Sequence, residues 1–88
     1  MPYQIFLHLK ADASLKKLDK KIQNLVKKQI SELKFSPDRS ERLLGTNFWK
    51  QRAGNYRIIN EIELISNRVI ILFIGHRKNV YDEFQRLL

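Results

Sequence analysis

Lysine, arginine, histidine and tyrosine side chains gather in two short segments in the second half of this 88-residue chain. The first segment carries Lys50, Arg52 and Arg57, and the second is Gly75-His76-Arg77-Lys78, with Tyr81 close behind. Arginine is suited to binding phosphate because its planar fork contacts two oxygens at once. Histidine, lysine and tyrosine can transfer protons when they are held beside a reacting group. Together the two segments predict a site for an anionic substrate.

The spacing of the cations predicts that they converge. Lys50 and Arg52 are two residues apart, so in a strand they point to the same face. Arg57 begins the next strand, just across the turn at Ala53-Gly54-Asn55. Arg77 ends a third strand that runs antiparallel to the second, which brings it close to Arg57. Each of these side chains alone would be interpreted as a solvated strand residue, but their convergence favours a functional site.

Four ring-bearing side chains leave alternatives open. His76 either acts as a general base or packs against the helices, because its strand parity opposes that of Arg77. Tyr81 either contacts a base or exchanges a proton, or is simply a half-buried helix residue. Phe48 and Trp49 occupy opposite faces of one strand. We therefore expect one of the two in the core and the other beside the groove, where it could contact a base.

The hydrophobic pattern predicts an α+β fold with an N-terminal strand, a helical hairpin, a three-stranded antiparallel meander and a short C-terminal helix. Residues 3–10 alternate as in a strand, and the apolar residues of Ala11–Leu33 recur every three or four positions as in helices. Asp19 is expected to cap the second helix, after a break near Leu18–Lys20. The predicted meander strands and final helix are Asn47–Arg52, Tyr56–Leu64, Val69–Ile74 and Val80–Leu88. We expect the helices to pack on one face of the sheet and the other face to stay partly open.

Composition limits the classes of function. The chain is short enough for one domain, residues 1–88, with a modest core. Its formal net charge of +8 favours an anionic partner such as nucleic acid, an acidic protein segment or a membrane surface. The sequence has no cysteine, no metal-ligand spacing and no glycine-rich phosphate loop. Because it also shows neither a signal-peptide layout nor a membrane-spanning run, we expect a soluble cytoplasmic protein without metal or cofactor.

Two motifs carry a family resemblance. The first is Gly54-Asn55-Tyr56-Arg57-Ile58-Ile59, and the second, after the apolar run Val69–Ile74, is Gly75-His76-Arg77-Lys78-Asn79-Val80-Tyr81. In this order they resemble the RelE/ParE superfamily of bacterial and archaeal toxins, and the helical segment Leu15–Ile22 is similar to the first half of that family. The resemblance implies a RelE-like fold and a toxin of a type II toxin–antitoxin pair. RelE-like members cut mRNA in the ribosomal A site and so inhibit translation, whereas ParE-like members share the fold and inhibit DNA gyrase.

The RelE-like alternative, an mRNA endoribonuclease, is favoured because the arginines and the terminal tyrosine occur together. The resemblance implies that Arg57 and Arg77 bind the transition state and that Tyr81 is the catalytic tyrosine. Lys50 falls at an active-site lysine, and His76 is a further candidate for proton transfer. RNA-binding roles are expected for Arg52, Lys78 and Trp49.

The chain departs from the family pattern at two places. Phe48 stands where a second lysine is expected, and the spacing from Arg77 to Tyr81 is shorter than in the best-known member. The identity of the general base therefore stays open. The implied partners are an acidic, RelB-like antitoxin, the ribosome with its mRNA, and operator DNA, which the toxin–antitoxin complex would bind through the antitoxin. No membrane partner is expected.

Overall fold

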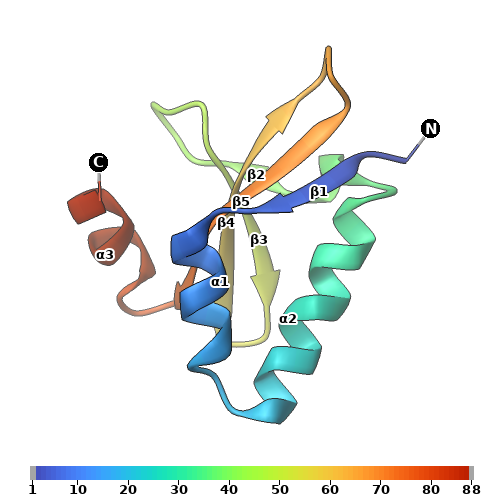
Figure 1. Cartoon of the computed structure of the whole chain (residues 1–88). Coiled ribbons are helices and arrows are strands. Elements are labelled where there is room, and N and C mark those ends of the chain that lie inside the picture. Colours follow the sequence, from blue (N-terminus) through green and yellow to red (C-terminus); the bar gives the residue numbers. More distant parts are fainter. Residues whose placement is uncertain (1, 88) are drawn as a thin grey trace.

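The computed structural model describes residues 2–87 and contains a five-stranded sheet with helices on both faces (Figure 1). The strand order is β1-β5-β4-β3-β2, with β1 parallel to β5 and the other neighbours antiparallel. The strands are β1 (Gln4–Leu7), β2 (Glu41–Arg42), β3 (Trp49–Ala53), β4 (Tyr56–Glu63) and β5 (Arg68–His76). The helices are α1 (Leu9–Lys16), α2 (Lys20–Leu33) and α3 (Val80–Leu87), with a 3-10 turn, η1, at Pro37–Arg39. The predicted α+β class and the order of the main elements are confirmed.

The helical hairpin breaks where the sequence predicts. Asp19 precedes α2 in an extended conformation, and its Oδ1 accepts a hydrogen bond from the Ile22 amide at 3.0 Å. This cap satisfies one of the backbone donors that the first helical turn leaves unpaired. The side-chain amide of Gln23 donates to the Leu18 carbonyl at 2.8 Å and closes the same corner. Local polar contacts therefore set the break.

The first strand is shorter than predicted. His8 caps α1, because its Nδ1 accepts a hydrogen bond from the Lys10 amide at 3.1 Å. Leu9 and Lys10 are therefore helical, and the prediction that the alternating strand extends to Lys10 is wrong. Leu9 is 83% exposed, so its place in the alternating pattern does not reflect burial.

The turns of the meander fall where predicted, but the connection before it contains an additional strand. Gly54 and Asn67 have positive φ angles of 60° and 55°, which glycine and asparagine tolerate. Strand β2 was not predicted, because two residues are too few to show an alternating period. It pairs with the start of β3, so that Glu41 lies opposite Lys50.

The sheet separates two apolar clusters, and neighbouring residues of β4 belong to different ones. Ile58 lies in the larger cluster, which is closed by α1 and α2, and Ile59 lies in the smaller cluster, which is closed by α3. We call these two sides the hairpin face and the α3 face. On the α3 face, Phe84 meets Phe48 edge to face with ring centroids 5.1 Å apart. The expectation that the helices pack on one face is correct for α1 and α2 but wrong for α3.

A bulge in β5 determines which side chains reach each face. The pairing of β4 with β5 shifts by one residue between Ile59 and Asn60, which leaves Leu72 as an extra residue in β5. Leu72 and Phe73 both pack into the cluster under α3. The alternation is therefore inverted beyond them, and His76 lies on the hairpin face.

Candidate active site

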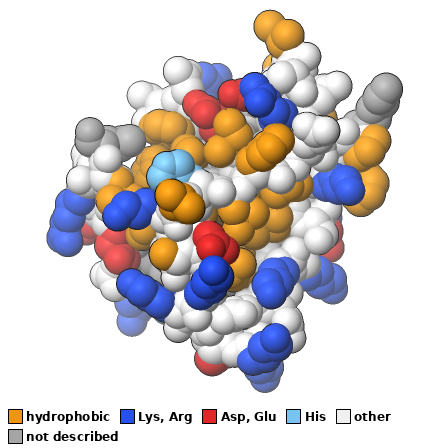
Figure 2. All heavy atoms as spheres, in the orientation of Figure 1, with side chains coloured by type: hydrophobic (Ala, Val, Ile, Leu, Met, Phe, Trp, Pro, Cys, Tyr) orange, Lys and Arg blue, Asp and Glu red, His pale blue; other side chains and the backbone are white. Residues whose placement is uncertain are grey.

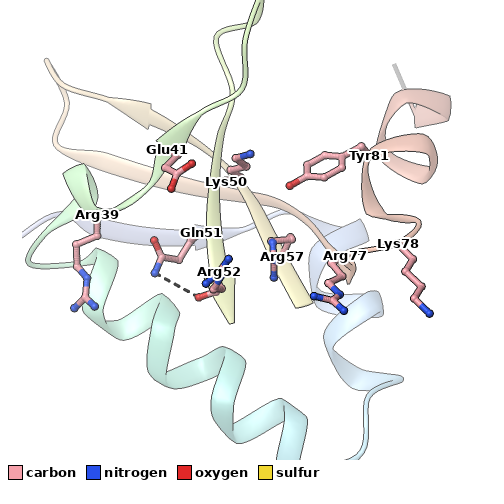
Figure 3. A pocket seen from close by; sticks show the side chains of 9 residues that line it. All are labelled: Arg39, Glu41, Lys50, Gln51, Arg52, Arg57, Arg77, Lys78 and Tyr81. Carbon is pink, nitrogen blue, oxygen red and sulfur yellow. Dashed lines mark hydrogen bonds between the residues drawn. The ribbon is translucent and has the colours of Figure 1, made fainter. Parts of the chain in front are cut away.

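An open groove of about 660 Å³ lies between the β3–β4 hairpin and the start of α3 (Figure 3). Its lining residues are Arg39, Glu41, Lys50, Gln51, Arg52, Arg57, Arg77, Lys78 and Tyr81. We call it the cationic groove, because six of these residues are lysine or arginine and one is a carboxylate. A concentration of positive charge in a concave surface raises the local potential and attracts polyanions. The groove therefore has the charge and the open shape that favour the approach of an anionic chain.

Two strands supply half of the cations. Lys50 and Arg52 alternate with the buried residues of β3, which places both on the α3 face. Arg52 lies directly opposite Arg57 of β4. Like charges in such cross-strand positions repel each other. An anion bound between them would relieve this repulsion.

Backbone carbonyls of the β3–β4 turn hold Arg57 in place. Its Nη1 donates hydrogen bonds to the carbonyl oxygens of Gly54 and Tyr56, both at 2.9 Å. A Cβ added at Gly54 would lie 2.9 Å from Leu25 Cδ2, so the hairpin packs tightly on α2 at this point. A guanidinium has five N–H donors, and the remaining ones stay available to a ligand. The turn therefore orients the arginine without exhausting its capacity to bind.

The loop between β5 and α3 supplies Arg77 and Lys78, and the first turn of α3 supplies Tyr81. The Arg77 amide donates to the Asn55 carbonyl at 2.8 Å, which ties this loop to the β3–β4 turn. The Lys50 Nζ lies 5.7 Å from the centroid of the Tyr81 ring. Such a cation–π contact favours the observed orientation of the ring. The Tyr81 hydroxyl points into the groove (Figure 3).

The groove contains two charged residues that the sequence reasoning missed. Arg39 forms an ion pair with Glu32 at 2.7 Å, and Glu41 faces Lys50 across the β2–β3 pair. Glu41 is the one carboxylate that lines the groove. Both residues belong to the segment between the helical hairpin and the meander, for which the sequence predicted no element. Only recognition of the short strand β2 would have placed them beside β3.

Six of the eight predicted site residues lie together in the groove. They are Lys50, Arg52, Arg57, Arg77, Lys78 and Tyr81. The other two, His76 and Trp49, do not line it. Trp49 lies in a small apolar hollow with Pro37 and Ile62, where the guanidinium carbon of Arg42 is 5.9 Å from its ring. The expectation of an aromatic side chain from this strand beside the groove is therefore wrong, since Phe48 packs against α3.

The lysines of the helical hairpin are arranged differently. In the view of Figure 2, lysine and arginine side chains are spread along the lower border of the molecule, whereas hydrophobic side chains occupy the centre. Lys20, Lys21, Lys27 and Lys28 of α2 are all exposed. They form a solvated face that adds long-range attraction for a polyanion.

Two further properties concern the described part of the chain as a whole. Among residues 2–87, no group of three or more histidine, aspartate or glutamate side chains is placed to hold a metal ion. No helix in the same range is long and apolar enough to cross a membrane.

Solved structures of several toxins share this fold. A chain of the RelBE2 toxin–antitoxin complex of Mycobacterium tuberculosis is 27% identical with a TM-score of 0.79, covering 88% of this chain and 100% of its own. A mutant of the E. coli toxin RelE in the free state is 26% identical with a TM-score of 0.76, covering 100% of both chains. A chain of the RelB–RelE complex of Methanococcus jannaschii is 26% identical with a TM-score of 0.71, covering 90% of this chain and 98% of its own. The fold and the groove thus define a toxin of the RelE/ParE superfamily.

The amino-acid sequence assigns the chain to one family within this superfamily. A family model described as ParE toxin of type II toxin-antitoxin system, parDE, matches residues 5–81, so the chain belongs to this family. No curated protein sequence gives a match. The resemblance that the two motifs carry is confirmed, and the chain is a toxin of a type II toxin–antitoxin system.

Proposed function

We propose that this toxin is an endoribonuclease that cuts mRNA in the A site of the ribosome, in the cytoplasm, and so inhibits translation. The cationic groove carries this proposal, because six cations and Tyr81 converge there on one open surface. An open groove suits an extended nucleic-acid strand, whereas small molecules are usually bound in enclosed pockets. The likeness to RelE toxins supports this choice, because the family resemblance implies that RelE-like members cut mRNA.

The proposed reaction is an attack of a ribose 2′-oxygen on the adjacent phosphorus. The new O–P bond forms as the 2′-OH gives its proton to a base, and the bond from phosphorus to the 5′-oxygen breaks. The leaving 5′-oxygen takes up a proton, which yields a 2′,3′-cyclic phosphate and a 5′-hydroxyl end. Negative charge builds on the phosphorane oxygens in between. Arg57 and Arg77 are assigned to this charge, since preorganised donors stabilise a transition state without reorganisation.

Five side chains of the groove are proposed for proton transfer or substrate positioning. Lys50 and Glu41 face each other across the β2–β3 pair, and both line the groove. One of them is proposed to take the proton of the 2′-OH. Tyr81 is proposed to act on the leaving oxygen, because its hydroxyl points into the groove from the opposite side (Figure 3). Arg52 and Lys78 are assigned to neighbouring phosphates.

Replacing Tyr81 by phenylalanine separates its two possible contributions. The ring stays beside Lys50, but the hydroxyl is lost. We expect cleavage of mRNA on isolated ribosomes to fall about 100-fold, the usual contribution of a general acid or base. Tyr3→Phe is the matched control, because Tyr3 packs in the larger cluster outside the groove. Wild-type cleavage by Tyr81→Phe would assign the contribution of Tyr81 to its ring alone.

Primer extension on a well-translated mRNA tests the proposed function directly. After brief expression in bacteria, we expect new stops inside the reading frame that are absent from an untranslated copy of the same message. Such stops require both cleavage and the ribosome. Growth arrest without stops would contradict the nuclease function.

One observation favours a second function, the inhibition of DNA gyrase without nuclease activity. The family model that matches the chain is the one described as ParE toxin. This function needs no catalysis, so the groove residues would be dispensable as a set. A supercoiling assay with purified gyrase decides between the two. Inhibition that persists in Arg77→Ala would select the gyrase function, and unimpaired supercoiling would reject it.

The proposed partner is an acidic, RelB-like antitoxin that wraps the basic surface. The net charge of +8 and the similarity to chains from RelB–RelE complexes support this choice. Binding of operator DNA by the complex is assigned to the antitoxin. Helix α3 is eight residues long and buries two of them, Val80 and Phe84, so a partner helix could displace it.

Hydrogen exchange with and without antitoxin tests this displacement. We expect the α3 amides to lose protection in the complex. Those of β4 and β5 should keep theirs, because the antitoxin helix would cover the same face of the sheet that α3 leaves. Unchanged protection across α3 would show that the antitoxin binds without displacing the helix. The α2 amides serve as the internal reference.

A further inference from the structure

We infer, building on the proposed function, that His76 is a positioning residue that holds the loop carrying Arg77 and Lys78. It is the last residue of β5, and the inverted alternation beyond the bulge places it on the hairpin face. Its ring does not line the cationic groove, whereas the two residues that follow it do. His76 therefore acts on the groove through the loop and not through contact with substrate.

The loop is fixed by three consecutive backbone amides. The Arg77 amide donates to the Asn55 carbonyl at 2.8 Å, and the Asn79 amide donates to the His76 carbonyl at 3.0 Å. Between them, the Lys78 amide donates to Nδ1 of His76 at 3.2 Å. This middle bond is the one of the three that a side chain accepts. It can therefore be removed by substitution while both backbone bonds are kept.

The imidazole that accepts this bond is itself held in place. Tyr56 lies opposite His76 in the β4–β5 pair, and the two rings meet edge to face with centroids 5.4 Å apart and planes at 77°. Tyr56 also packs against the larger apolar cluster, so the core supports the ring. Since Nδ1 accepts a hydrogen bond, the neutral ring carries its proton on Nε2.

The far end of the loop is packed just as tightly. A Cβ added at Gly75 would lie 3.1 Å from Cγ2 of Val80, the first residue of α3. Val80 is fully buried in the cluster under α3. The segment from Arg77 to Tyr81 is thus held by the imidazole near its start and by Val80 near its end. Release of the Lys78 amide is expected to move the groove-lining side chains of this segment together.

The chain offers a matched control for this contact. His8 accepts a hydrogen bond from the amide two residues ahead, that of Lys10, through the same ring nitrogen at 3.1 Å. It does so at the start of α1, outside the cationic groove. Loss of this bond removes an equivalent interaction without touching the loop before α3.

Three variants of the full chain test the inference. His76→Asn keeps an acceptor, because its Oδ1 can reach the amide two residues ahead as in an Asx turn. His76→Leu fills a similar volume but accepts nothing, and His8→Leu is the control. The readouts are amide exchange at Lys78 by NMR, affinity for a short single-stranded RNA that cannot be cleaved because its 2′-oxygens are methylated, and cleavage of mRNA on isolated ribosomes.

We expect His76→Leu to speed exchange of the Lys78 amide and to weaken the oligonucleotide affinity, each by about tenfold, the upper range of one intramolecular hydrogen bond. His76→Asn should stay within about threefold of the wild type in both measurements and in cleavage, a gap well below one hydrogen bond. His8→Leu should change exchange only at the start of α1.

Two results would overturn the inference. The first is unchanged exchange at Lys78 in His76→Leu, because the imidazole would then not hold the loop. The second is a His76→Asn protein that protects the Lys78 amide yet cleaves as poorly as His76→Leu, which would require the imidazole in the chemistry. The exchange measurement needs no nuclease activity. A wild-type protein without cleavage would therefore reject the proposed function while exchange still decides the role of His76.

Discussion

Replacing Arg77 by alanine is expected to slow mRNA cleavage by about 100- to 1,000-fold, the usual cost of removing one donor that binds a developing oxyanion. The amide of Arg77 would still bond to the Asn55 carbonyl, since alanine keeps the backbone donor. The loop should therefore keep its position while the charge disappears. Single-turnover cleavage of mRNA on isolated ribosomes measures the effect, and unchanged thermal unfolding confirms the fold.

Arg86→Ala provides the control for net charge. Arg86 is an exposed residue of α3 that does not line the cationic groove. Removing it lowers the net charge by the same amount, so long-range attraction to the ribosome changes equally in both variants. Cleavage by Arg86→Ala should stay close to that of the wild type. Equal losses in the two variants would mean that Arg77 contributes general charge and no transition-state contact.

The substitution Phe84→Ala should detach α3 and leave the rest of the fold in place. Phe84 packs edge to face on Phe48, with ring centroids 5.1 Å apart, and its ring centroid lies 6.3 Å from that of Phe73. Truncating a buried phenylalanine costs about 3–5 kcal/mol. Because the cluster under α3 is separate from the larger one, the cost should appear as local unfolding of α3. Hydrogen exchange should show unprotected α3 amides and nearly native protection in β4 and β5.

Gln85→Ala, an exposed change on the same helix, serves as the reference for Phe84→Ala. It should alter the free energy of unfolding by no more than about 0.5 kcal/mol. Cleavage by Phe84→Ala should fall together with α3 protection, since Tyr81 loses its support. A uniform loss of protection across the sheet would show that the two clusters unfold as one unit.

Local patterns predicted much of this molecule correctly. The cap at Asp19 and the turn at Gly54 each depend on a residue type with a defined backbone preference, so both could be placed from the sequence. Strand parity put Lys50 and Arg52 on one face, and antiparallel pairing brought Arg77 toward Arg57. The cationic groove follows from these two rules.

The features that were missed depend on contacts between distant segments. The face that α3 covers is set by Phe84 meeting Phe48, and their positions in the sequence do not indicate this contact. Glu41 is placed beside the groove by β2, and a strand of two residues is too short to show a pattern of alternating side chains. The bulge could not be predicted for a different reason. Because Val69–Ile74 is apolar throughout, the segment shows no polar–apolar alternation that would indicate which face each side chain occupies.

The bulge at Leu72 also bears on how a strand of this kind tolerates an insertion. Because the extra residue is absorbed where it occurs, His76 stays opposite Tyr56 and Val69 stays opposite Ile62. A homologue that lacks the extra residue and has a regular strand would therefore keep a histidine at the equivalent position on the same face of the sheet. A homologue with the same number of residues in this strand but without a bulge would instead turn that histidine to the α3 face. Counting residues from the start of the strand would thus assign the wrong face, so an alignment of the two kinds of chain needs a gap at the bulge.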